Sequence, residues 1–131
     1  MEDNFKLEII SPEKIIFSDN TKMVILPSYE GDMGILKNHI PIITFLRPGI
    51  IKVQKNDESF KEFFVQDGTV EYFDDSLVVL SASATNIRDL SKEYVDNLNK
   101  DIQNKLTDQN ITDHDRYVLN HKLDTLKEIR V

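Results

Sequence analysis

The distribution of glycine and proline divides the chain into two parts with different hydrophobic patterns. All four glycines and all four prolines occur before residue 87, and none follows it. In the first part, short β-branched apolar runs alternate with turn-forming pairs such as Pro48-Gly49 and Asp74-Asp75. In the second part, apolar residues recur at spacings of three and four, which is the period of an α-helix. The sequence therefore predicts strands over residues 1–86 and helices over residues 87–131.

The apolar runs of the first part predict an antiparallel β-sandwich. They recur at intervals of ~8–12 residues, a spacing typical of sandwiches and barrels. Residues 5–9 alternate apolar and charged side chains, as expected of a strand with one wet face. We expect an exposed turn at Asp32-Met33-Gly34, from which Glu30, Asp32 and Met33 project. The predicted strands are Phe5–Ile10, Ile15–Phe17, Met23–Leu26, Ile42–Leu46, Ile50–Val53, Phe60–Val65, Val70–Phe73 and Leu77–Leu80.

The second part predicts an antiparallel hairpin of two helices, which makes the whole chain an α+β protein. Asp89 or Ser91 can cap the first helix, and Thr112 with Asp115 forms a capping pattern for the second. Such a hairpin has a single apolar seam, so we expect it to be weakly stable unless it docks. The first apolar stripe is Leu90, Tyr94, Val95, Leu98, Ile102 and Leu106, and the second is Val118, Leu119, Leu123, Leu126 and Ile129.

Composition excludes several classes of function. The 131 residues contain no cysteine, so neither a disulfide framework nor a thiolate metal site is available. The formal charge of −7 argues against nucleic acid as the main partner. The longest apolar stretch, residues 40–46, is far shorter than the ~20 residues that a membrane-spanning helix needs. The acidic start at residues 1–4 resembles neither a signal nor a transit peptide, so we expect membrane association only through a partner.

No group of residues nominates an active site, a metal site or a cofactor site. His114 and His121 are seven residues apart, which is wider than the i, i+4 spacing of helical metal ligands. We interpret both as solvent-facing helix residues. His39 follows a glycine-containing turn, and it is either a packed loop residue or a contact residue. The sequence also lacks a phosphate-binding glycine loop and a nucleophile elbow, so we predict a non-enzymatic protein without cofactors.

One segment carries a specific family pattern. Glu30–Pro41 reads E-G-D-M-G-I-L-K-N-H-I-P, and Arg47-Pro48-Gly49 follows it. Together with Ser11-Pro12-Glu13 and Phe64–Gly68, this pattern resembles the epsilon subunit of F-type rotary ATP synthases, whose mitochondrial counterpart is called delta. The resemblance covers the whole chain. It implies a rotor subunit of the central stalk that couples ion flow through the membrane c ring to ATP synthesis.

The resemblance also implies contact residues for each partner. Glu30, Gly31, Asp32, Met33 and Gly34 correspond to the segment that faces the c ring. Ser11, His39 and Ile42 correspond to positions near the gamma subunit. A bacterial member would lie peripherally at the cytoplasmic face of the plasma membrane.

The helical hairpin has a regulatory role in this family. In many members it extends along gamma, contacts the catalytic alpha and beta subunits and inhibits ATP hydrolysis; the basic candidates here are Arg116, Lys122, Lys127 and Arg130. Residues 87–131 carry eight basic against nine acidic side chains, so we expect weak inhibition at most. The family's ATP motif has Asp and Arg where this chain has Ser91 and Tyr94. We therefore predict no nucleotide binding.

A different class of function stays open from the sequence. The first part can be a free-standing β-sandwich binding module, with the helices as an oligomerisation arm. A chain that forms a stable homo-oligomer and ignores gamma would fit that alternative. A monomer that gamma captures would fit the rotor subunit.

Overall fold

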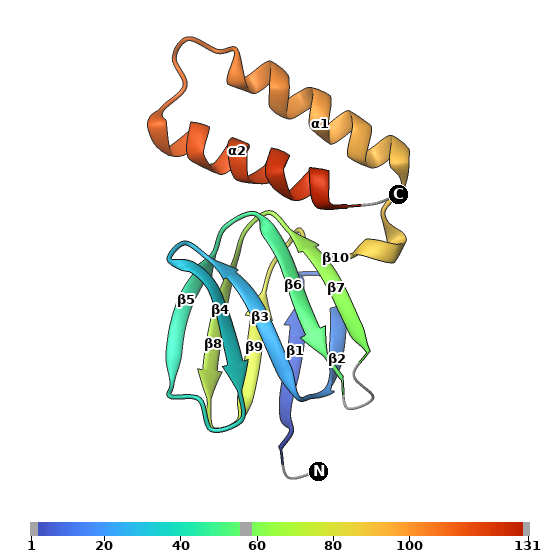
Figure 1. Ribbon diagram of the computed structural model, residues 1–131, viewed down its shortest axis with the longest axis vertical. Coiled ribbons are helices and arrows are strands. Elements are labelled where there is room, and N and C mark those ends of the chain that lie inside the picture. Colours follow the sequence, from blue (N-terminus) through green and yellow to red (C-terminus); the bar gives the residue numbers. More distant parts are fainter. Residues whose placement is uncertain (1–2, 56–58, 130–131) are drawn as a thin grey trace.

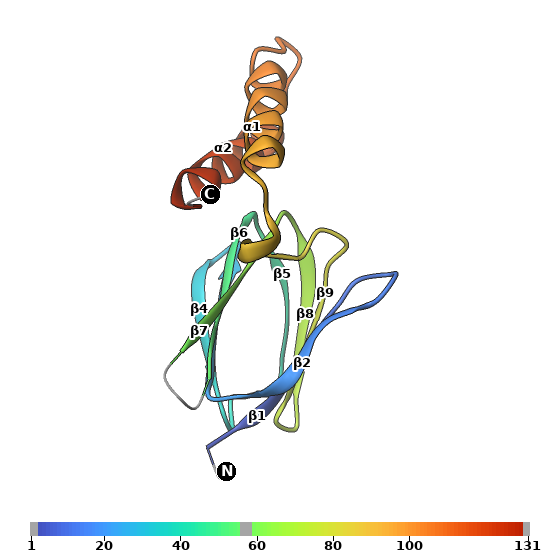
Figure 2. The ribbon, with the colours of Figure 1, turned by 90° about the vertical axis from the view of Figure 1, so that its right-hand side faces the viewer.

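The computed structural model describes residues 3–55 and 59–129. Its strands form two facing layers, with a helical hairpin across one end (Figures 1 and 2). The strand order is β10-β7-β6-β3-β5-β8-β9-β1-β2, and β4 pairs only with β3. Only Ser28 and Leu46 pair between β3 and β5, where the two layers meet. The strands are β1 (Phe5–Ile10), β2 (Ile15–Thr21), β3 (Met23–Ser28), β4 (Gly31–Leu36), β5 (Ile42–Leu46), β6 (Gly49–Gln54), β7 (Phe60–Val65), β8 (Gly68–Phe73), β9 (Ser76–Leu80) and β10 (Thr85–Asn86).

The predicted sandwich followed by two helices is confirmed, and strands β1, β5 and β7 have the predicted bounds. The expected turn at Asp32-Met33-Gly34 is wrong, because these residues lie inside β4 and pair with β3. The turn comes earlier, at Tyr29-Glu30, and Gly31 follows it with a φ of 116°. A glycine-rich, polar stretch has low strand propensity, and its pairing with β3 overrides that propensity.

The sandwich encloses its own hydrophobic core. Inward-facing side chains from both layers are almost completely buried between the sheets, among them Leu7, Val24, Phe63, Tyr72 and Val79. Met33 and Ile42 are half-buried and pack against this core. Because strands alternate their side chains, the opposite face of each layer is left for solvent or for other contacts.

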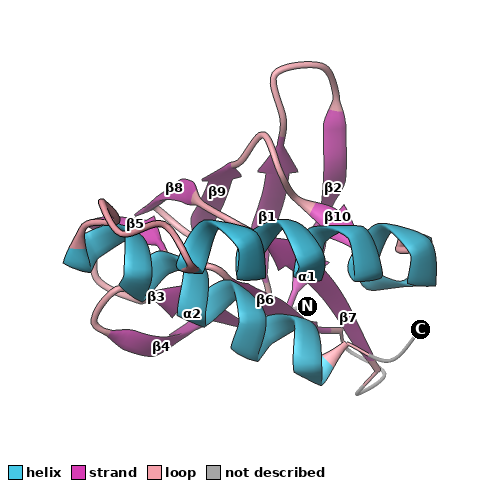
Figure 3. Cartoon of the chain, turned by 90° about the horizontal axis from the view of Figure 1, so that it is seen from above, coloured by secondary structure: helices cyan, strands magenta, loops and turns pink. Residues whose placement is uncertain are grey.

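The two helices pack against each other and against the end of the sandwich (Figure 3). A short 3₁₀ turn (η1, Ile87–Asp89) leads into α1 (Lys92–Leu106), and α2 (Asp113–Glu128) returns. Ser91 caps α1, since its hydroxyl accepts the backbone N–H of Tyr94, and Thr112 caps α2 in the same way. Tyr94 was predicted to be in the apolar stripe of α1, but its side chain is exposed.

The hairpin completes its hydrophobic cluster with side chains of the sandwich. Phe63 and Phe64 are neighbours on β7, so their side chains point to opposite faces. Phe63 enters the sandwich core, whereas Phe64 joins the cluster of α1 and α2, together with Ile50 of β6. The helical members of this second cluster include Val95, Leu98, Ile102, Leu119, Leu123, Leu126 and Ile129. The hairpin is therefore docked at the end of the sandwich where β6 begins and β7 ends.

Candidate subunit-binding surfaces

The layer that the hairpin leaves uncovered carries an exposed apolar surface. Large side chains of β5, β8 and β9 point away from the core: Ile43 is 73% exposed, Phe45 63%, Phe73 64% and Leu80 52%. We call the outward side of β5-β8-β9-β1, with Ile10, Ile43, Phe45, Phe73, Val78 and Leu80, the outer face. In Figure 2 this layer lies on the side away from β4 and β7. A cluster of this kind is typical of a protein–protein interface.

The strand register arranges the outer face in rows across the sheet. Phe45 pairs with Thr69, Thr69 with Leu80, and Leu80 with Ile10. Ile43 begins the next row and faces Glu71. This second row continues through Val78 of β9 to Glu8 of β1, so each row crosses four strands. Thr69, Glu71 and Glu8 supply polar groups among the apolar side chains, as in most subunit interfaces.

The predicted gamma contacts Ser11 and His39 lie at opposite ends of the outer face. Ser11 follows β1 at the end near the hairpin, where it lines a shallow hollow with Ile10, Phe45 and Leu80. Its hydroxyl bonds with the backbone of Lys14, and this bond shapes the β1–β2 turn. Ile42, the third predicted contact, packs inward against the core. Because side chains alternate between the two faces of β5, the neighbouring Ile43 is the exposed residue.

His39 lies at the far end of the sandwich, before β5. Its ring meets Tyr72 edge-on, with the ring centroids 5.7 Å apart, and it is half-buried. The Tyr72 hydroxyl donates to Asp75 at 2.8 Å. Burial, and then this hydrogen bond, raise the pKa of Tyr72 to about 12. The backbone N–H of Asn38 and the Tyr72 hydroxyl lower the pKa of Asp75. His39 is thus a packed loop residue with part of its ring still accessible.

The Glu30–Pro41 motif extends over the length of one strand, so its two functional ends are far apart. β4 contains six residues, which span about 20 Å at ~3.3 Å per residue. The β3–β4 turn, which contains Glu30, lies at the hairpin end of the sandwich, and the β4–β5 connection, which contains His39, lies at the far end (Figure 1). Residues assigned to two different partners therefore occupy two different ends.

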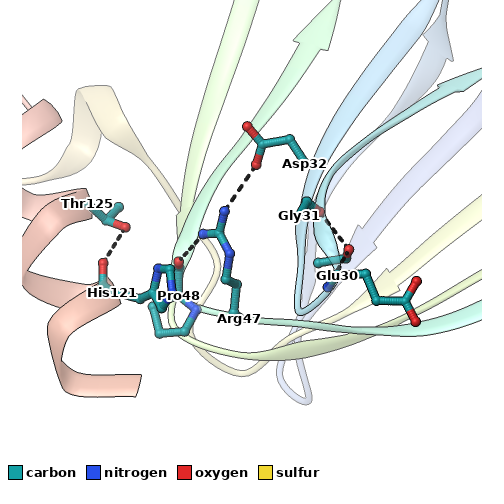
Figure 4. A network of polar contacts seen from close by, with 8 residues as sticks. Glu30, Gly31, Asp32, Arg47, Pro48, His121 and Thr125 are labelled. Carbon is teal, nitrogen blue, oxygen red and sulfur yellow. Dashed lines mark hydrogen bonds and ion pairs between the residues drawn. The ribbon is translucent and has the colours of Figure 1, made fainter. Parts of the chain in front are cut away.

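Arg47 connects the predicted c-ring segment to the turn between β5 and β6 (Figure 4). One guanidinium nitrogen donates to the Asp32 carboxylate at 3.2 Å, and the other donates to the Pro48 carbonyl at 3.0 Å. Asp32 itself is 70% exposed, whereas Arg47 is largely covered. The acidic groups of Glu30 and Asp32 stay accessible in this arrangement, whereas Met33 is half-buried and packs against the core.

The glycines of the two motifs have different roles. Gly49 has no room for a side chain, since an added Cβ would lie 2.5 Å from Cβ of Pro27. A Cβ on Gly34 would meet nothing within 4 Å. Gly31 needs its positive φ at the end of the β3–β4 turn. Close packing thus explains Gly49 in the Arg-Pro-Gly motif, and nothing within the described part of the chain explains Gly34.

The basic side chains predicted for inhibitory contacts do not form one cluster. Arg116 and Lys127 are exposed on α2, and Lys122 is half-buried. Burial, and then the charge of Lys105, lower the pKa of the Lys122 ammonium. Arg130 lies outside the described residues. At the start of α1, Ser91 acts as the helix cap, and Tyr94 is exposed.

Comparison with known proteins assigns the family. Residues 4–87 match the model of the ATP synthase delta/epsilon chain, β-sandwich domain. The chain belongs to the ATP synthase delta/epsilon family. It is 40% identical to an ATP synthase epsilon chain of Pelagibacter ubique, over 98% of this chain and 99% of that one. It is 34% identical to the ATP synthase epsilon chain of Parvibaculum lavamentivorans, over 99% and 98% of the two chains.

Solved structures share the fold of this epsilon-family chain. One chain in the Euglena gracilis mitochondrial ATP synthase, in a structure of its OSCP, F1 and c-ring parts, superposes with a TM-score of 0.77 at 16% identity. That match covers 95% of this chain and 80% of the other. A chain from the central stalk and c-ring of the Tetrahymena thermophila enzyme gives a TM-score of 0.60 at 12% identity, covering 94% and 93%. Among the described residues, no helix is long and apolar enough to cross a membrane.

Proposed function

We propose that the chain is a non-catalytic rotor subunit in the central stalk of a bacterial F-type ATP synthase. In this role it binds the gamma subunit and the c ring and helps couple ion flow to ATP synthesis. It reaches the membrane only through the complex, at the cytoplasmic face. Family membership supports the assembly, and the outer face is the observation that carries the binding role. Residues 1–86 form the binding part, and residues 87–131 form a mobile regulatory part.

The outer face is the surface that we assign to gamma. Ile43, Phe45 and Leu80 are too exposed to stabilise the sandwich by burial, and a partner would cover them at once. Ser11 and His39 mark the two ends of this surface. An elongated partner that lies along the strands would touch both ends together.

A charge placed in the outer face tests this assignment. Size-exclusion chromatography of the chain with its cognate gamma subunit is expected to give a one-to-one complex. Phe45→Asp should weaken the complex at least tenfold, because a carboxylate would be buried without a partner. The control Phe60→Asp changes a comparably exposed phenylalanine on β7, away from the outer face, and should leave binding unchanged.

Two results would contradict the gamma assignment. One is a Phe45→Asp variant that binds gamma as tightly as the original chain. The other is a chain that forms a stable homo-oligomer and does not bind gamma, which would favour the free-standing binding module with an oligomerisation arm.

The c ring is assigned to the β3–β4 turn and the start of β4. Glu30 and Asp32 present accessible carboxylates there, which suit basic loops of a partner. Asp32→Lys should weaken attachment to the c ring in reconstituted complexes and leave gamma binding intact. Glu13→Lys makes the same charge change in the β1–β2 turn and serves as the control. Equal effects of both variants would reject this contact.

The hairpin is assigned a weak inhibitory role and no nucleotide site. Arg116 and Lys127 are exposed and can contact acidic surfaces of the alpha and beta subunits. Deleting residues 87–131 should raise ATP hydrolysis by no more than several-fold, and a larger rise would contradict weak inhibition.

Calorimetric titration with ATP should reveal no affinity tighter than millimolar, since the positions of the binding motif hold Ser91 and Tyr94.

A further inference from the structure

The seam between α2 and the sandwich contains stacked rings in addition to apolar side chains. Tyr29, at the tip of the β3–β4 turn, stacks on both His114 and Tyr117, with centroid distances of 6.3 and 6.0 Å. Tyr117 in turn meets the ring of His121 edge-on at 4.4 Å. These α2 residues lie three and four positions apart, so one helix face carries them all. His114 thus contacts the sandwich directly through Tyr29, and His121 lies further along the same face of α2, next to Tyr117.

His121 is the member of this seam that faces a fixed positive charge. It is half-buried, and Figure 4 shows it beside Pro48 and Arg47 of the turn between β5 and β6. Arg47 is held on the sandwich by Asp32 and by the Pro48 carbonyl, and its charge acts on His121. The sequence predicted a solvent-facing His121, and the docked sandwich overturns that prediction.

The other charged and titratable groups around His121 give only partial compensation. On α2, Asp124 favours the protonated imidazole, and Tyr117 contacts it through its ring. The pKa of Lys122, the next residue, is lowered first by burial and then by the charge of Lys105 on α1. From the sandwich, Asp32 is mostly solvated and already paired with Arg47. A proton on His121 would thus add a second positive charge to the seam.

We propose that His121 and Arg47 form a pH-sensitive latch, in which protonation of His121 weakens the docking of the hairpin onto the sandwich. The proposal concerns the isolated chain, so it does not depend on the partners assigned above. In the docked state the imidazole is neutral and packs against Tyr117. When the hairpin leaves, the same imidazole is exposed to water and binds a proton at its ordinary pKa.

The direction of the effect follows from the difference between the two states. Burial, and then the charge of Arg47, lower the pKa of His121 in the docked hairpin. A group with a lowered pKa contributes stability that is complete above its ordinary pKa and is lost as the pH falls through the lowered value. The ordinary value for an imidazole is about 6.5. Acidification below that value should therefore shift the equilibrium toward the undocked hairpin.

Hydrogen exchange of the full chain tests the latch. Amide exchange in α2, corrected for the intrinsic pH dependence of the chemistry, gives the opening constant of the hairpin at pH 7.5 and pH 5. Each unit of pKa difference corresponds to a change of about tenfold in this constant. We expect opening to increase several-fold at pH 5, while β1 amides, which lie in the sandwich core, show no comparable change.

Three variants separate the latch from a general acid effect. His121→Gln should stay docked at both pH values and lose most of the pH response. His39→Gln, at the far end of the sandwich, should keep the full response. Arg47→Gln retains the histidine but removes the facing charge, so it should show a smaller response than the original chain. The Arg47→Gln variant also tests the latch if His121→Gln disturbs the packing of the hairpin.

Two results would overturn the proposed latch. Equal opening constants at the two pH values in the original chain would overturn the proposal. A full pH response in both His121→Gln and Arg47→Gln would overturn it as well, because the response would then come from other groups. Failure of gamma binding would leave the latch unaffected, so the two proposals can fail separately.

Discussion

The sandwich and the hairpin differ in how they complete their hydrophobic clusters. The sandwich buries Leu7, Val24 and Val79 entirely between its own two layers. The hairpin has only one apolar seam, and it covers that seam with Phe64 and Ile50, which belong to the sandwich. The first part is therefore self-sufficient, whereas the second depends on its neighbour. Because the hairpin depends on contacts with the sandwich, it can undock while the sandwich stays folded.

Separating the two parts should have the largest effect. A chain that ends at Asn86 should keep its β-sheet circular dichroism and unfold cooperatively. A peptide of residues 87–131 should be mostly unfolded, because two short helices without Phe64 and Ile50 bury too little apolar surface. A stably helical monomeric peptide would show that the hairpin does not need the sandwich.

Two adjacent phenylalanines of β7 belong to different hydrophobic clusters. Phe63→Ala should lower the free energy of unfolding by about 3–5 kcal/mol, since it leaves a cavity in the sandwich core. Phe64→Ala removes a contact that exists only while the hairpin is docked. It should raise hydrogen exchange in α1 and α2 while leaving sandwich protection nearly unchanged. Equal loss of protection in both parts of the Phe64→Ala variant would mean that they unfold as one unit.

Two glycines provide a matched pair within the sandwich. Gly49→Ala should cost about 1–3 kcal/mol of unfolding free energy, because the new methyl group collides with Pro27. Gly34→Ala places the same group in open space, and it should be nearly neutral for folding. Denaturant titration of both variants measures the difference. Similar losses in the two would show that the tight approach at Gly49 is not the cause.

The smallest effect is expected at a helix cap. Thr112→Ala removes the hydroxyl that accepts the Asp115 backbone N–H at 3.0 Å, and such a loss costs about 1 kcal/mol. The cost should appear as faster exchange in α2 alone. The control Thr107→Ala lies just after α1, so it should leave the start of α2 protected. If β1 lost protection as well, the hairpin would be coupled to the sandwich more tightly than we infer.

Much of the fold could be predicted from the sequence, because periodicity and turn residues act locally. The bounds of β1 follow from its alternation, and the caps of α1 and α2 follow from Ser91 and Thr112. Strand β4 was missed, since Gly31 and Gly34 in a polar stretch favour a turn until β3 supplies its partner.

The surfaces were harder to predict, because they depend on contacts between distant segments. Adjacent Phe63 and Phe64 look equivalent in the sequence, and only the docked hairpin gives Phe64 a second core. One feature of the sequence indicates the outer face, namely the alternation of side chains in β5. Ile43 and Phe45 alternate with Ile42 and Thr44, so one of the two sets had to face outward. Which set faces outward is decided by the pairing with β8.

Site-directed crosslinking in the assembled ATP synthase tests whether the outer face binds the gamma subunit. The chain contains no cysteine, so single cysteines can be placed at Phe45 on the outer face and at Phe60 on β7 and labelled cleanly with a short photoactivated crosslinker. We predict a crosslink from position 45 to the gamma subunit and none from position 60. Crosslinking to gamma from position 60 but not from position 45 would contradict the assignment of the outer face.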